Sequence, residues 1–93
     1  MAVTVKRCVI VPSKLSEKII IPGGSKFLYC NFGPQGMEVI HMWFEVNDDF
    51  EPVERRFYVF PTDRALPGNV PLEYIGTAQD PSIRTAMHVY ERK

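Results

Sequence analysis

Short runs of β-branched and aromatic residues recur along the chain, separated by proline and glycine at intervals of about 8–12 residues. The alternation is clearest over 37–46, where successive side chains of a strand would point to opposite faces. One parity of this segment begins with Glu38 and is apolar from there on, so it is expected to face a core: Ile40, Met42, Phe44 and Val46. The other parity is mixed, with Val39, His41, Trp43 and Glu45.

The same pattern predicts strands at 3–11, 18–21, 26–32, 37–46, 53–60, 72–78 and 85–91. Prolines and glycines supply the reversals between them, and little of the chain is left for helix. We therefore expect one all-β domain over residues 1–93, with six or seven mostly antiparallel strands in a roll or a small, partly open barrel. The segment 61–71 holds three prolines and is expected to be an ordered excursion over one end of the sheet.

The segment 47–52 is the most acidic part of the chain and is expected to be the tip of a long hairpin between 37–46 and 53–60. Five carboxylates without a base fall within ten residues here, and Phe50 stands among them. A solvated turn is one interpretation. The second is an aromatic-tipped protrusion that docks on a basic protein surface. Calcium binding is a weak third, because the acids do not follow the spacing of a calcium loop.

Trp43 has two interpretations, because its parity is opposite to that of the apolar stripe. It belongs either to a second core layer or to a patch for an oligomer or another partner. The candidate partner-binding residues are therefore Trp43, Asp48, Asp49, Phe50 and Glu51.

Charge and composition remove several classes of function. The 93 residues carry 11 basic and 11 acidic side chains, so the net charge is zero and we expect no non-specific binding of nucleic acid. No segment approaches the roughly 18 apolar residues of a membrane span, and the first residues do not resemble a signal peptide. We expect a cytoplasmic protein without a membrane partner.

The candidate chemistry is sparse. Cys8 and Cys30 lie singly in apolar runs, which predicts two buried thiols rather than a zinc site or a disulfide. His41 and His88 could form a metal site with Glu38, Glu45 or Glu91 only if their strands pair, and we disfavour it. We expect no catalytic residues, no cofactor and no metal. Arg55 and Arg56 should lie on opposite faces of one strand.

Several segments resemble a family of short phage and prophage proteins of unknown function. The segments are Glu54-Arg55-Arg56-Phe57 with Tyr58 to Thr62, then Leu66-Pro67, then Tyr74-Ile75-Gly76-Thr77-Ala78-Gln79, and His88-Val89-Tyr90-Glu91. Upstream, Ile21 to Leu28 resembles the proline turn of that family and Trp43 its tryptophan. Asp63 stands where the family usually has a glycine, and Met87 where it has a tryptophan. The resemblance implies a viral source and a host-cytoplasmic location, and it brings no catalytic residues.

We therefore expect a small phage-encoded accessory protein that binds a host or viral protein stoichiometrically. Inhibition of a host defence factor, such as an anti-CRISPR activity, fits this class only by analogy. The alternatives are a virion or assembly component and, less favoured, a small metal-dependent enzyme. A homodimer through a sheet edge or face also stays open.

Overall fold

Seven strands form two antiparallel sheets in the computed structural model, which describes residues 3–12, 16–33, 39–80 and 85–93. The strands are β1 (Val3–Ile10), β2 (Ser16–Pro22), β3 (Lys26–Phe32), β4 (Ile40–Asn47), β5 (Pro52–Pro61), β6 (Leu72–Asp80) and β7 (Thr85–Arg92). A three-stranded sheet has the order β1-β4-β3, and a four-stranded sheet has the order β2-β5-β7-β6. The expected all-β class and strand number are confirmed, and the sheets do not close into a barrel.

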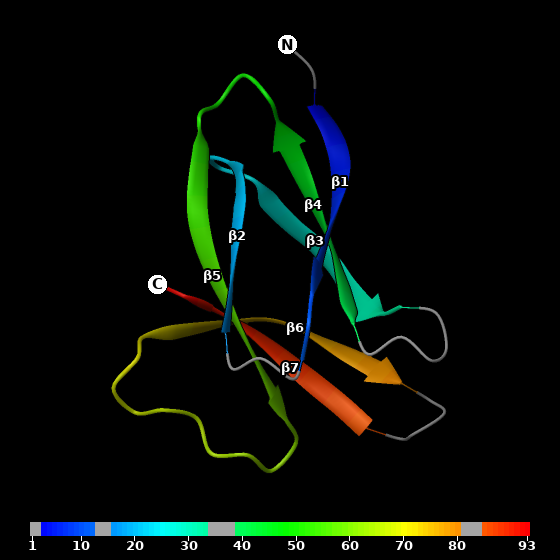
Figure 1. Ribbon diagram of the computed structural model, residues 1–93, viewed down its shortest axis with the longest axis vertical. Helices are drawn as coiled ribbons and strands as arrows, with labels where there is room; N and C mark the ends of the chain where they lie inside the picture. The colour runs from blue at the N-terminus through cyan, green and yellow to red at the C-terminus, as the bar shows by residue number, and fades with distance from the viewer. Residues whose placement is uncertain (1–2, 13–15, 34–38, 81–84) are drawn as a thin grey trace.

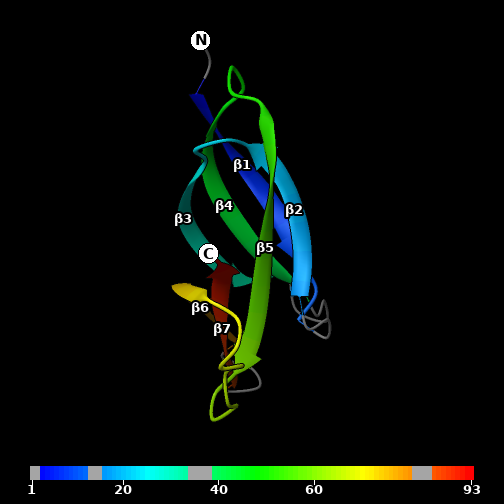
Figure 2. The ribbon, with the colours of Figure 1, turned by 90° about the vertical axis from the view of Figure 1, so that its left-hand side faces the viewer.

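The two sheets pack face to face in a thin molecule with extents of 41 × 34 × 17 Å (Figures 1 and 2). The side chains buried between them are Ile10, Ile21, Cys30, Ile40, Met42, Phe44, Val46, Phe57, Val59, Ala78 and Val89. The apolar parity of β4 is thus the core face, as its alternation predicts. In β1 the inward residues are Cys8 and Ile10, whereas Val5 and Val9 face outward and are exposed.

The connection between β4 and β5 is not the hairpin that we expected. β4 pairs with β1 and β3, whereas β5 pairs with β2 and β7, so the chain crosses from one sheet to the other at this connection (Figure 1). The chain makes the same crossing between β2 and β3. The two crossings lie side by side, because the amide of Gly23 donates a hydrogen bond of 2.8 Å to the carbonyl oxygen of Glu51.

The segment 62–71 lies against the outer face of the four-stranded sheet, as expected for an ordered excursion. Tyr58 and Phe60 point outward from β5 but are only 9% and 3% exposed, and together with Leu66 and Val70 they line a shallow groove. The segment turns at Asp63, whose φ is 72°. Among the described residues it is the one non-glycine with positive φ, which explains why a glycine suits this position.

The two sheets also approach closely where β6 passes β3. β6 has a register shift between Tyr74 and Gly76, and a Cβ atom on Gly76 would lie 3.1 Å from both Cys30 Sγ and Phe27 Cζ. Glycine is therefore required here by the approach of β3 rather than by its own backbone angles.

Candidate functional site

The acidic turn, residues Asp48 to Glu51, presents its side chains to solvent. Phe50 is 58% exposed although it is a large apolar residue. The backbone of the turn is fixed from below by Asn47: its carbonyl oxygen accepts a 3.2 Å hydrogen bond from the Phe50 amide, and its Oδ1 accepts one of 2.9 Å from the Asp49 amide. The turn therefore holds an aromatic ring out in water on an ordered backbone.

Two of the acidic side chains near the turn have a lysine beside them. Glu54 forms an ion pair with Lys18 at 3.0 Å, and Glu45 stands opposite Lys26 in the register of β3 and β4. The other three of the five carboxylates between Glu45 and Glu54 lie in the acidic turn beside Phe50 in the chain. Asp48, Asp49 and Glu51 are all exposed.

Trp43 lies on the outer face of the three-stranded sheet and is half-buried there. Its ring is 5.7 Å from that of Tyr29 and 5.9 Å from that of His41, measured between centroids. No described element covers this face, since Tyr29 is 56% exposed and Val5 is 61% exposed. The structure therefore contradicts the interpretation of Trp43 as part of a second core layer.

The five candidate residues do not form one cluster. Asp48, Asp49, Phe50 and Glu51 share the turn, whereas Trp43 precedes Asn47 by four residues in the middle of β4. At about 3.4 Å per strand residue this separation is roughly 14 Å. The outer face of the sheet and the acidic turn are therefore adjacent surfaces.

Tyr29 was missed by the sequence analysis, although it is the nearest aromatic partner of Trp43. Alternation would place it on the same face as Phe27, which is inward. A register shift between Phe27 and Tyr29 reverses the alternation, so Tyr29 turns outward and Cys30 inward. The strand segment carries no glycine or proline that could have marked this shift.

The disfavoured metal site is not assembled. His41 lies on the outer face of the three-stranded sheet and His88 on the outer face of the four-stranded one, so the core separates them. Within the described part of the chain no three metal-ligating side chains come together. Glu38 lies outside the described residues.

His88 is part of a chain of hydroxyl groups on the four-stranded sheet. Its Nε2 is 2.9 Å from Thr62 Oγ1, and its Nδ1 is 3.0 Å from Thr77 Oγ1, which in turn is 2.6 Å from the Tyr74 hydroxyl. A hydroxyl beside a histidine is one part of a nucleophilic site, but the residue that orients this ring is a threonine and not a carboxylate. The contacts instead fasten the segment after β5 to β6 and β7.

Cys8 on β1 and Cys30 on β3 lie on either side of Met42, which is on the central strand β4. Cys8 and Cys30 both pair with it from opposite sides, which places them about 10 Å apart and out of disulfide reach. Burial raises the pKa of Cys30 to about 11. Burial also raises the pKa of Cys8, opposed by the charge of Lys6. Both thiols are thus weak nucleophiles with a structural role.

Comparison with known proteins identifies a family whose function is unknown. Residues 1–93 match the family described as a domain of unknown function, DUF7352, so the chain belongs to that family. No curated protein and no solved structure matches the chain. The described residues include no helix that is long and apolar enough to cross a membrane.

Proposed function

We propose that this chain acts by stoichiometric binding of another protein, through the acidic turn and the neighbouring outer face of the three-stranded sheet. The observation that carries the proposal is Phe50, an aromatic side chain 58% exposed at an ordered turn and surrounded by Asp48, Asp49 and Glu51. Because the backbone under the ring is already ordered, binding has to fix only the side-chain torsions of Phe50, which favours an interface anchor.

The partner that fits this surface has a basic patch around an apolar pocket. Carboxylates at the rim of an interface speed up encounter and select among partners more than they increase affinity. The affinity would come from Phe50 in the pocket, with further apolar contact from Trp43 and Tyr29. A standard interface takes about 800 Å² from each partner, which the turn and the adjacent sheet face together can supply.

The class of partner follows from the resemblance to phage proteins. If the source is a phage, the partner is a host or viral protein in the host cytoplasm, and inhibition of a defence factor is the function we propose within that class. This proposal needs no catalytic residue, since an inhibitor acts by occupying a surface.

The test begins with affinity purification from the natural host and continues with the purified partner. We expect Phe50→Ala to weaken binding by about 2 kcal/mol, or roughly 30-fold, because a hot-spot ring is lost. Asp48→Asn with Asp49→Asn should mainly slow association and reduce its dependence on salt. Leu66→Ala is the matched control, because Leu66 is 44% exposed but lies in the segment on the other sheet.

Unchanged affinity in a folded Phe50→Ala, Asp48→Asn, Asp49→Asn variant would show that the turn is only a solvated connection. Loss of binding in Leu66→Ala but not in this variant would move the interface to the four-stranded sheet.

A further inference from the structure

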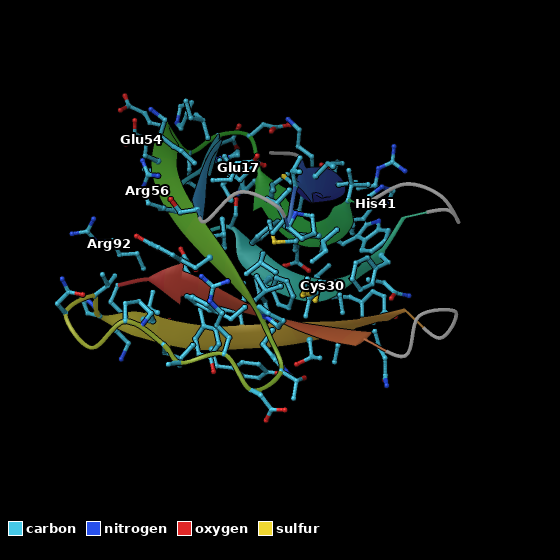
Figure 3. The ribbon with its side chains drawn as sticks, turned by 60° about the horizontal axis from the view of Figure 1, so that its bottom comes forward. Glu17, Cys30, His41, Glu54, Arg56 and Arg92 are labelled. Carbon is cyan, nitrogen blue, oxygen red and sulfur yellow. The ribbon has the colours of Figure 1, made fainter. Side chains whose placement is uncertain are left out.

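Three cations form a row across the outer face of the four-stranded sheet. Lys18 pairs with Arg56 in the register of β2 and β5. Arg56 and Arg92 each lie one residue beyond Phe57–Glu91, the last pair in the register of β5 and β7, and both line one hollow. Arg56 and Arg92 share the outward parity of Tyr58 and Tyr90. In Figure 3 the labelled Arg56 and Arg92 lie on one side of the molecule, away from His41. We call Lys18, Arg56 and Arg92 the basic row.

Neighbouring like charges on a sheet are unfavourable, and the described residues compensate them only in part. Lys18 has Glu54 as its ion-pair partner at 3.0 Å, and Arg56 donates a 2.9 Å hydrogen bond from Nη1 to Ser16 Oγ. The side chain of Arg92 makes no ion pair or hydrogen bond with the described residues. The sheet therefore tolerates a repulsion that an anion would relieve.

Two of the carboxylates nearby, Glu54 and Glu91, are already paired. Glu91 points to the inner face, where Arg55 holds it in a bidentate pair with contacts of 2.5 and 2.7 Å. A hollow of about 300 Å³ lies where β5 begins and β7 ends, and residues of both faces of the sheet line it: Lys18, Glu54, Arg55, Arg56, Glu91, Arg92 and Lys93. Each of its two carboxylates is paired with one of its five cations. The positive charge left over belongs to Arg56, Arg92 and Lys93.

We propose that this hollow binds a phosphate group. Guanidinium groups present a planar set of donors that matches the oxygens of phosphate, and the ammonium of Lys93 adds a further charge. The backbone of Lys93 is held in position, because its amide donates a 3.0 Å hydrogen bond to the Pro71 carbonyl oxygen. The site lies on the other sheet from Trp43 and does not depend on the proposed protein interface.

The size of the row limits the ligand. Three adjacent strands span about 10 Å, which accommodates one or two phosphate groups rather than a long polyanion. The chain has no net charge, so binding depends on this local arrangement and not on a general attraction to nucleic acid. A small phosphate compound and the phosphodiesters of a short single strand share this chemistry.

The experiment uses the whole chain in a chloride buffer of low ionic strength, with two probes. Inorganic pyrophosphate is titrated by calorimetry, and a labelled oligothymidylate by fluorescence anisotropy. We expect saturable binding of pyrophosphate, weakened at least about tenfold in Arg56→Gln, Arg92→Gln. The matched control, Arg7→Gln, Arg64→Gln, makes the same change of charge at exposed positions outside the hollow and should change the affinity less than about twofold.

The two probes identify the source of the phosphate. Binding of pyrophosphate alone indicates a free phosphate compound, and binding of the oligothymidylate with the same dependence on Arg56 and Arg92 indicates a strand. The proposal is overturned if neither probe saturates, or if the control variant weakens binding as much as the double variant does. Arg92→Gln alone serves if the double variant fails to fold, with a loss of about threefold or more expected.

Discussion

At the scale of single residues, two positions show how the structure explains what the sequence resemblance leaves unexplained. Asp63 departs from the family's usual glycine, and the structure gives it a φ of 72°, which aspartate tolerates better than most residues do. Gly76 keeps the family's glycine, and the structure gives it no space for a Cβ atom. At position 63 the backbone angle favours the family's glycine, whereas at position 76 glycine is required because there is no space for a Cβ atom. A single sequence cannot distinguish the two.

Gly76→Ala should therefore destabilise the protein. Its methyl group would meet Cys30 Sγ and Phe27 Cζ at 3.1 Å, and β3 and β6 would have to move apart. We expect a loss of about 1–3 kcal/mol in the free energy of unfolding, measured by urea denaturation. Gly68→Ala is the control, because nothing lies within 4 Å of its added Cβ atom and its φ is not positive. Equal effects of the two substitutions would contradict the packing argument.

At the scale of the elements, the strands were largely predictable and their pairing was not. The predicted strands agree with those observed to within two or three residues at each described end. One error lies at 47–52, which we expected to be a hairpin tip and where the chain instead crosses between the sheets. Alternation with a period of two shows which side chains face the core, but it does not show which strand lies alongside.

Prediction of the candidate sites was limited in the same way, because the sequence does not show which strands pair. The acidic turn is local in sequence, so its exposed aromatic ring could be inferred from five adjacent residues. Lys18, Arg56 and Arg92 meet only through the register of three strands that are far apart in the chain. Nothing in the sequence around any one of them distinguishes it from an ordinary surface cation. The row could therefore not be predicted before the strand pairing was known.

The adjacent arginines Arg55 and Arg56 do lie on opposite faces, and the inner one, Arg55, contacts residues of both sheets at the rim of the core. Arg55 donates to Glu91 and, at 2.6 Å, to the Ser25 carbonyl oxygen, and its guanidinium lies 5.3 Å from the centroid of the Phe44 ring. The side chains of Arg55 and Glu91 are 19% and 15% exposed. Loss of either partner would leave the other charge poorly solvated at the rim of the core.

A double-mutant cycle measures this contribution. We expect Arg55→Met and Glu91→Gln each to cost about 2–3 kcal/mol, somewhat less than a fully buried pair would, with a coupling energy of about 1–3 kcal/mol. The exposed pair of Lys18 with Glu54 is the control, with side chains 46% and 64% exposed and an expected coupling below about 1 kcal/mol. Similar coupling in the two pairs would show that Arg55 acts only as a surface charge.

At the scale of the whole molecule, the fold has one core layer and unusually large outer faces. The chain exposes 6141 Å², whereas a monomer of its mass of 10.7 kDa is expected to expose about 5,500 Å². The thin dimension of 17 Å is consistent with two sheets about 10 Å apart and their outward side chains. Outside the part of β5 that the segment 62–71 covers, each strand therefore has one face that packs in the core and one that faces solvent.

Trp43 and Phe44 are adjacent residues that test this division. Phe44 is fully buried, with the rings of Phe27 and Phe57 at centroid distances of 5.6 and 5.8 Å, so Phe44→Ala should cost about 3–5 kcal/mol. A domain of 93 residues has roughly 5–14 kcal/mol of stability in total, so this variant should lose between about a fifth and all of that stability.

Trp43→Ala should cost only about 1–2 kcal/mol, because the ring is half-buried and its neighbours Tyr29 and His41 stay solvated after its removal. Urea denaturation of both variants measures the difference, with near-ultraviolet circular dichroism to confirm that Trp43→Ala retains a packed core. If Trp43→Ala unfolds as readily as Phe44→Ala, the outer face of the three-stranded sheet is covered in solution. A concentration-dependent midpoint in the unaltered protein would then identify a second copy of the chain as the cover.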